Sequence, residues 1–123
     1  MKVIIAGGRD ICDQEKVFAL IDKTILRWRE QGLPEISEIV SGTATGVDTL
    51  GEQYANEHNI PIKRFPADWE TYGKGAGPIR NRQMADYADR LIVIMHEDSR
   101  GSRNMFETMQ KLHKPGQAWI IKK

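Results

Sequence analysis

Several features that mark other protein classes are scarce in this sequence of 123 residues. Cys12 is its one cysteine, which rules out an intramolecular disulfide and a cysteine-based zinc cluster. Long hydrophobic runs are also missing: the first apolar stretch stops after Ala6 at two glycines, too early for a signal peptide or a membrane span. We therefore expect a cytoplasmic protein that does not bind membranes.

An excess of charge of either sign is missing too. Eighteen Lys and Arg residues against seventeen Asp and Glu give a formal net charge of +1. Proteins that bind nucleic acids generally carry a strongly basic surface, so this balance argues against that class and requires any anion site to be local. The composition, 40% hydrophobic and 28% charged, is that of a globular protein, and the length fits a single domain over residues 1–123.

Short β-branched runs alternate with longer stretches of helical periodicity, a pattern that predicts βα units and a mainly parallel sheet flanked by helices. Strands are predicted at Lys2–Ala6, Glu38–Ser41, Ile62–Phe65, Leu91–Met95 and Ala118–Ile121. Helices are predicted at Asp13–Gln31, at Val47–Glu57, from Pro78 to about Ala88, and after Arg100-Gly101-Ser102 until Lys114-Pro115-Gly116. The expected fold class is α/β, with one five-stranded sheet.

Three loops rich in glycine and hydroxyl residues follow the first, second and fourth predicted strands. They are Gly7–Asp10, Gly42–Asp48 and His96–Arg103. In an open parallel sheet such loops meet at the carboxyl edge, where ligands bind, and the free N–H groups of helix N-termini favour phosphate. Any one of them alone could be an ordinary turn or helix cap. Three at one edge indicate a site for an anion or a nucleotide.

Arginine is concentrated around the same loops. Five of the nine arginines lie in them or at the start of the third helix, namely Arg9, Arg80, Arg82, Arg100 and Arg103. The planar guanidinium suits bidentate contacts with phosphate. The alternative is an internal salt-bridge network in which Asp10, Glu97 and Asp98 neutralise these arginines.

The connection Ala67–Gly77, with three glycines, is the best candidate for a lid. Its stretch Gly73–Gly77 is similar to a dinucleotide fingerprint, but no strand precedes it and the acidic ribose partner is missing, so we interpret it as a flexible loop. Trp69 and Tyr72 either stack on a base or anchor the loop to the core, and both interpretations stay open.

The sequence gives little indication of a metal site, a reactive cysteine or a P-loop. The three histidines, His58, His96 and His113, are scattered, and two of them lie near predicted helix ends, where capping is commoner than metal binding. Cys12 has no histidine nearby, which favours a structural role. The sequence also lacks GxxxxGK[ST], which argues against a P-loop ATPase or GTPase. We expect no metal and no cofactor.

Five short motifs in a fixed order carry a family resemblance over essentially the whole chain: Ile4–Asp10, Ser41–Asp48, Phe65–Trp69, Gly77–Arg82 and Ser99–Ser102. The sequence resembles the YspA/YpsA-related branch of the SLOG superfamily, whose Smf/DprA-like and LOG-like members share a Rossmann-like fold. The resemblance implies a pocket for a nucleotide or a nucleotide-derived, ADP-ribose-like ligand, lined by Gly7, Gly8, Arg9, Ser41, Gly42, Thr43, Gly46, Asp48, Arg80, Asn81, Gly101 and Ser102. Trp69, Ser99 and Arg100 complete the site predicted from the residues themselves.

The sequence departs from the LOG-like enzymes at one position. Those enzymes carry a PGGxGTxxE element whose glutamate acts in cleaving an N-glycosidic bond, and Met105 stands at that position here. Glu107 is a poor substitute, because two residues along a helix rotate a side chain by roughly 200°. Only Arg80-Asn81 is retained from their catalytic pattern. Asp48 matches the acidic residue after the SG-x-x-x-G element of the Smf-like proteins, and it also suits a helix N-terminus.

The resulting functional expectation is a nucleotide-binding protein that acts as a ligand sensor. A second hypothesis is hydrolysis of the N-glycosidic bond of nucleoside monophosphates, with Asp48, Asp10 or Glu97 supplying acid–base chemistry, although no catalytic residue is assigned. Single-stranded DNA binding is a third hypothesis, weakened by the near-zero net charge. Met and Phe positions on the last helix suggest a seam between copies, so a homo-oligomer is expected.

Overall fold

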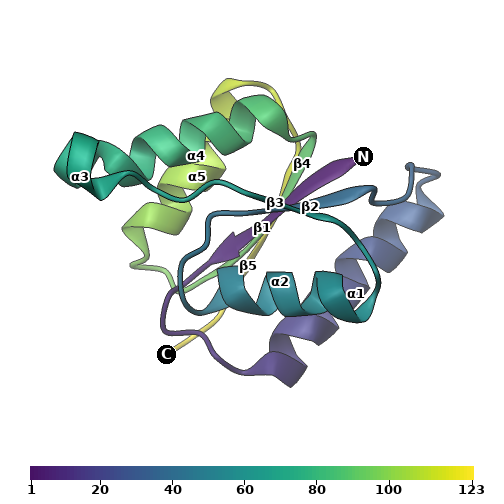
Figure 1. The fold of residues 1–123 in the computed structure, drawn as a ribbon. Coiled ribbons are helices and arrows are strands. Elements are labelled where there is room, and N and C mark those ends of the chain that lie inside the picture. The colour runs from purple at the N-terminus through teal and green to yellow at the C-terminus, as the bar shows by residue number, and fades with distance from the viewer.

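The computed structural model describes all residues, 1–123, which form a parallel sheet between two layers of helices (Figure 1). The strands are β1 (Lys2–Gly7), β2 (Glu38–Ser41), β3 (Ile62–Arg64), β4 (Arg90–Met95) and β5 (Gly116–Ile120). They are arranged in the order β3-β2-β1-β4-β5, and every neighbouring pair is parallel. The predicted α/β class and five-stranded parallel sheet are confirmed, and each strand lies within two residues of its predicted bounds.

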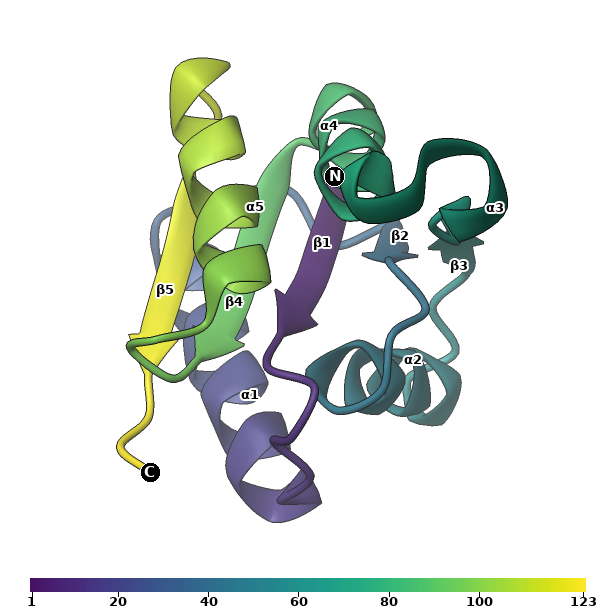
Figure 2. The same ribbon diagram turned by 90° about the vertical axis from the view of Figure 1, so that its left-hand side faces the viewer.

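The helices are α1 (Gln14–Glu30), α2 (Val47–Glu57), α3 (Trp69–Tyr72), α4 (Ala76–Tyr87) and α5 (Arg100–Lys111), with a 3-10 turn at Gly73–Gly75. Figures 1 and 2 show α1 and α2 on one face of the sheet and α4 and α5 on the other. Asp13 caps α1 by accepting a hydrogen bond of 3.2 Å from the N–H of Lys16. None of the helices is both long and apolar enough to cross a membrane.

The interpretation of Gly73–Gly77 as a flexible loop is wrong. The candidate lid Ala67–Gly77 contains α3, the 3-10 turn and the first two residues of α4. Asp68 begins this ordered stretch, because its side chain accepts a hydrogen bond of 3.1 Å from the N–H of Thr71. Pro78 is the third residue of α4 and not its first. Proline is tolerated there because N–H groups in the first turn have no partner within the helix.

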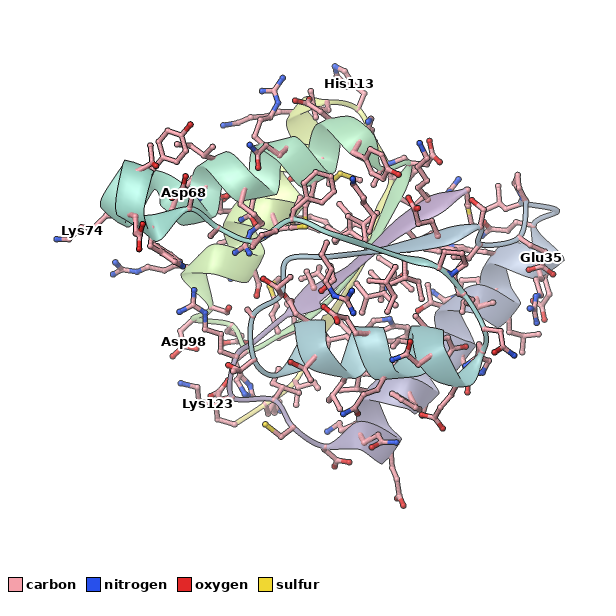
Figure 3. The ribbon with its side chains drawn as sticks, in the orientation of Figure 1. Glu35, Asp68, Lys74, Asp98, His113 and Lys123 are labelled. Carbon is pink, nitrogen blue, oxygen red and sulfur yellow. The ribbon has the colours of Figure 1, made fainter.

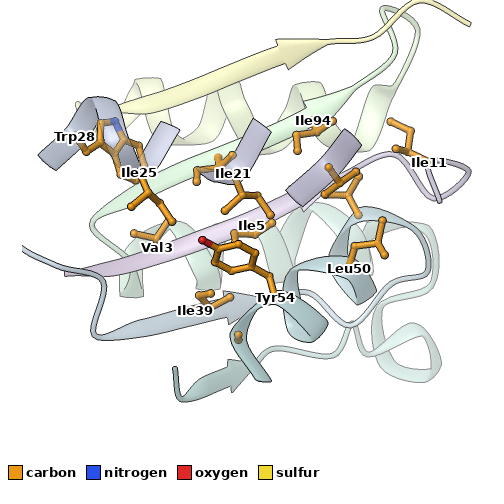
Figure 4. Packing of buried hydrophobic residues seen from close by; sticks show 14 residues of the cluster. Val3, Ile5, Ile11, Ile21, Ile25, Trp28, Ile39, Leu50, Tyr54 and Ile94 are labelled. Atoms are coloured by element: carbon orange, nitrogen blue, oxygen red, sulfur yellow. The ribbon is translucent and has the colours of Figure 1, made fainter. Parts of the chain in front are cut away.

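The core consists of one apolar cluster on each face of the sheet. Successive residues of a strand point to opposite faces, so Val3 and Ile5 pack toward α1 and α2 while Ile4 packs toward α4 and α5. Figure 4 shows Ile21, from α1, in the first of these clusters with both β1 side chains. Burial on both faces explains why the strands are apolar without interruption.

The last helix uses its methionines inside the core. Met105 and Met109 are each 1% exposed and belong to the cluster on the α4 and α5 face, where Phe106 and Leu112 pack partly buried. The two methionines are therefore not available for the seam suggested by the sequence. A homo-oligomer stays a prediction.

The strand order places a switch in direction beside β1. The chain moves outward from β1 through β2 to β3, then returns to pair β4 on the other side of β1. Loops after β1 and β4 consequently diverge at the carboxyl edge, and Figure 2 shows the arrowheads of both strands pointing to this edge. Ligand sites of open parallel sheets lie at this kind of position.

Close packing of two loops at that edge depends on Gly46. Its φ is +75°, and a Cβ atom there would lie 2.2 Å from the carbonyl oxygen of Gly8. Gly32 has nearly the same φ, +77°, with no atom near its missing Cβ. Both glycines therefore adopt a left-handed backbone conformation, but only Gly46 also packs closely against the backbone of another loop.

We expect Gly32→Ala to lower the free energy of unfolding by about 1–2 kcal/mol, the cost of a left-handed conformation. Gly46→Ala is expected to lower it by about 1–3 kcal/mol more, because the added methyl overlaps backbone atoms. Urea unfolding of the two variants and the wild type measures both effects. Equal losses for the two variants would contradict the close packing of these loops.

Candidate functional site

A cavity of about 650 Å³ opens at the carboxyl ends of β1 and β4. This volume is typical of small-molecule sites. Its wall contains most of the residues predicted from the sequence: Gly7, Gly8, Arg9, Asp48, Trp69, Arg80, Asn81, Ser99, Arg100, Gly101 and Ser102. The cavity is called the main cavity below.

A second cavity of about 340 Å³ adjoins the main cavity. Gly42 and Thr43, which were also predicted, lie in its wall. The two cavities share Arg9, Ala44, Trp69 and Arg80. These four residues therefore form the boundary between them.

Ser41 and Gly46, the remaining two predicted residues, line neither cavity. Both hold loops in place instead. The hydroxyl of Ser41 donates to Glu52 at 2.7 Å and accepts from the N–H of Thr43 at 3.1 Å. The backbone of Gly46 packs against Gly8, as described above.

Sequence reasoning missed part of the cavity wall. Asp10, Ala44, Thr45, His96 and Asp98 lie in the three selected loops but were not named as binding residues. The residues outside those loops that were not named as binding residues are Ala6, Lys74, Gly77, Pro78, Met84, Asn104, Met105 and Lys123 in the main cavity and Pro66 and Ala67 in the second. Lys123 had a usable signal, since it follows the last predicted strand and the ends of parallel strands share an edge. Met84 and Asn104 had none, because which face of a helix borders a cavity depends on packing.

The N-terminus of α5 presents free donors to the main cavity. Ser99 is the N-cap, but its hydroxyl donates to the hydroxyl of Ser102 at 2.9 Å and does not cap the helix. The N–H groups of Arg100, Gly101 and Ser102 have no acceptor within the protein. Such groups carry the positive end of the helix dipole. This end of α5 can therefore accept an anionic group.

Arg80 lies in the second turn of α4, 9% exposed, at the boundary between the cavities. Its Nη1 donates to the carbonyl oxygen of Gly42 and its Nε to Oδ1 of Asn81 at 3.1 Å. Its Nη2 makes no hydrogen bond within the protein. Because no buried side-chain nitrogen lacks a partner, Nη2 is accessible to solvent.

Asn81 connects Arg80 to α5. Its Nδ2 donates to Oδ1 of Asn104 at 2.9 Å and to the carbonyl oxygen of Gly101 at 3.3 Å. Since its Oδ1 accepts from Arg80, the side chain uses its donors and its acceptor at once. Asn81 thereby fixes the guanidinium relative to the N-terminus of α5.

Asp48 lies in the first turn of α2, 5% exposed, and borders the main cavity. Burial raises the pKa of its carboxyl to about 6. A hydrogen bond of 3.2 Å from the N–H of Ala44 and the charge of Arg80 limit this rise. Burial likewise lowers the pKa of Arg80, while the charge of Asp48 opposes that change. The Asp48 carboxyl therefore changes its charge close to neutral pH.

The arginines at the cavities are not neutralised by an internal network. Arg9, Arg80, Arg100 and Arg103 form no ion pair, and Arg82 pairs with Asp86 at 3.0 Å outside both cavities. The guanidinium of Arg103 donates to the carbonyl oxygen of Glu97 at 2.6 Å.

The acidic residues considered as neutralising partners face other groups. Figure 3 shows Asp98 beside Lys123, and their side chains are 2.8 Å apart. Asp10 lies 3.7 Å from the Nε2 atom of His96. No group of three or more His, Cys, Asp or Glu residues is placed to hold a metal ion. The main cavity therefore keeps an excess of unpaired positive charge.

Comparison with known proteins identifies the family of this chain. Residues 1–72 match the model of the family described as "YAcAr: YspA, cpYpsA-related SLOG family". The chain belongs to this SLOG family. It is also 32% identical over 117 residues to the Gene 61 protein of Mycobacterium phage D29, with 89% of each chain covered. The resemblance drawn from the five motifs is thus confirmed.

Solved structures show the same Rossmann-like fold. The chain superimposes on DNA processing protein A (DprA) from Streptococcus pneumoniae with a TM-score of 0.70 and 20% identity, over 95% of this chain and 49% of that one. DprA from Helicobacter pylori, described with its single-stranded DNA binding mode, gives a TM-score of 0.62 and 22% identity, over 96% and 64%. The chain therefore spans about half to two thirds of these DprA chains.

The resemblance to the LOG-like enzymes assigned the position of their glutamate to Met105. Met105 belongs to the core and borders the main cavity. Glu107 is exposed and lines neither cavity, as expected from its rotation around the helix. Glu97 also lies outside both cavities, whereas Asp48 and Asp10 border the main one.

Asp48 makes the stability of the protein depend on pH. Its pKa rises from 3.8 to about 6 on folding, so the folded state binds more protons between these values. The contribution of Asp48 to the free energy of unfolding is complete below pH 4 and is lost as the pH rises through 6. The total loss is about 3 kcal/mol. We therefore expect the stability of the wild type relative to Asp48→Asn to fall between about pH 4 and about pH 7.

Urea unfolding of both proteins across this range measures the difference. Asp98→Asn is the matched control, because a hydrogen bond from Lys123 lowers the pKa of Asp98 and moves its titration below the same range. The difference in the free energy of unfolding between Asp98→Asn and the wild type is expected to stay constant across this pH range. A level profile for Asp48→Asn as well would contradict the burial of its carboxyl.

Proposed function

We propose that this SLOG protein binds a nucleotide or nucleotide-derived ligand in the main cavity, with a phosphate at the N-terminus of α5. One observation carries the proposal: three unpartnered N–H groups and the unpaired Arg100 border the same cavity. Backbone donors and a guanidinium together favour a phosphate through hydrogen bonds, charge and the helix dipole. The role that we propose with this binding is that of a sensor of the ligand.

The charges around the main cavity support an anionic ligand. Arg9, Lys74 and Arg100 border it without ion pairs, and Arg80 keeps Nη2 free. Clustered cations repel one another, so a bound anion stabilises the arrangement. The near-zero net charge of the chain does not oppose this, because the effect of these groups is local.

Trp69 supports a ligand that also carries a ring. It is 50% exposed, borders both cavities and lies with its ring centroid 6.0 Å from the guanidinium of Arg9. A partly exposed tryptophan side chain can stack on a ring, and the arginine can contact a phosphate attached to the stacked group. Tyr72, also 50% exposed, lines neither cavity and has no part in this proposal.

Arg100→Ala is expected to weaken the binding of ADP and ADP-ribose by about 10–100-fold, the value of a hydrogen bond to a charged group. Arg82→Ala is the matched control, because Arg82 is an exposed arginine that pairs with Asp86 and lines neither cavity. Isothermal titration calorimetry of the wild type and both variants measures the affinities. The proposal is wrong if the wild type binds no nucleotide, or if the two variants weaken binding equally.

The alternative function is hydrolysis of an N-glycosidic bond, and the position of Asp48 is the observation that favours it. A carboxyl with a pKa of about 6 at the cavity can protonate a leaving base while water attacks the sugar carbon. Binding remains the better supported function, because α5 contributes a methionine and no carboxylate to the cavity.

Incubation of the wild type with nucleoside monophosphates is accordingly expected to release no free base. Chromatography of the mixture at high protein concentration is the measurement. Release of base that is lost in Asp48→Asn would establish hydrolysis in place of simple binding. Asp98→Asn serves as the control, since Asp98 borders the same cavity but pairs with Lys123.

Single-stranded DNA binding is the remaining candidate, suggested by the description of the Helicobacter pylori DprA structure. A strand needs several phosphate contacts along a track. Here the unpaired cations gather around two adjoining cavities, an arrangement that favours a small ligand over a strand.

A further inference from the structure

The second cavity has walls of two different kinds. Pro66, Ala67 and the ring of Trp69 form an apolar side. Thr43 is exposed in the loop between β2 and α2, and its hydroxyl makes no hydrogen bond within the protein. A flat ring with polar atoms at its edge suits such walls, because its faces contact apolar groups while its edge meets a hydroxyl.

Two guanidinium groups stand at the entrance from one cavity to the other. Arg9 and Arg80 both border both cavities, and neither forms an ion pair. Burial lowers the pKa of Arg80, the charge of Asp48 opposes this change, and the charge of Arg9 adds to it. Like charges held together in this way are relieved by an anion between them. The junction therefore has the chemistry of a second phosphate position, separate from the N-terminus of α5.

We propose that the ligand is a small dinucleotide, with two nucleosides joined through a diphosphate, and that the second cavity holds its second nucleoside. One phosphate lies at the N-terminus of α5 beside Arg100 and the other between Arg9 and Arg80. The first nucleoside occupies the rest of the main cavity, and Trp69 contacts the second. This inference rests on the proposed function and adds the class of ligand.

The volumes agree with a ligand of two parts. Each cavity alone is within the range of small-molecule sites, about 300–1,000 Å³. A nucleoside monophosphate placed at α5 would leave the second cavity and its two arginines without a partner, and a nucleoside diphosphate such as ADP would still leave the second cavity empty. A ligand that fills both positions binds more tightly than one that fills a single position, because its second half adds contacts without a second loss of translational and rotational entropy.

Calorimetry with diadenosine diphosphate and with ADP tests the proposal on the wild type. We expect the dinucleotide to bind at least about tenfold more tightly than ADP. Equal affinities would overturn the inference while leaving nucleotide binding in place. Failure of both ligands to bind would overturn the proposed function and this inference together. Tighter binding of oligothymidylate than of the dinucleotide would assign the second cavity to a nucleic-acid strand and also overturn it.

Ala67→Phe tests the place of the second nucleoside, because a phenyl group at this position fills the second cavity. We expect the affinity for diadenosine diphosphate to fall to that for ADP, and the affinity for ADP to stay within about twofold. Thr71→Phe is the matched control, since Thr71 is exposed on the same segment and lines neither cavity. An unchanged dinucleotide affinity in a folded Ala67→Phe protein would overturn the placement. The comparison of the two ligands on the wild type stands even if this variant does not fold.

Discussion

The hydrogen bonds of one buried guanidinium hold the candidate site together. Arg80 extends from α4 to the carbonyl oxygen of Gly42 in the loop after β2, and through Asn81 it is joined to the first turn of α5. A buried charge is expensive unless it is paired and hydrogen-bonded, so these partners are required by the fold. Asp48 contributes attraction without forming an ion pair. The relative positions of the main cavity, the second cavity and the α5 N-terminus all depend on this arrangement.

Close backbone approach is the second constraint on this edge of the sheet. A Cβ atom on Gly42 would lie 2.7 Å from Nη1 of Arg80 and 2.8 Å from the carboxylate of Asp48. Glycine at this position therefore lets an arginine, a carboxylate and a loop carbonyl share a small volume. The glycine-rich loops were interpreted from the sequence as places where a ligand approaches. At Gly42 and Gly46 the structure shows that the approaching group is the protein itself.

Net charge proved a poor guide to local charge in this protein. The balance of +1 averages over surface pairs such as Arg29 with Glu35 and Arg82 with Asp86. Of the three acidic residues at the main cavity, Asp98 is paired with a lysine, Asp48 is buried with a raised pKa, and Asp10 lies 3.7 Å from Nε2 of His96. Unpaired arginine therefore dominates there. Loop position in the sequence indicated which arginines gather at the edge, but which of them lack partners depends on side-chain geometry.

The sequence by itself determined the parallel sheet, its five strands and the family, because apolar runs and ordered loop motifs are local properties of the chain. It also indicated that the loops after β1, β2 and β4 share an edge, since parallel strands end on the same side. Tertiary structure alone decided that Ser41 and Gly46 support the site from outside the cavities, that Met105 faces the main cavity, and that two cavities meet at Arg9 and Arg80. Those facts follow from how helices pack across the sheet, and that packing is set by contacts between residues far apart in the sequence.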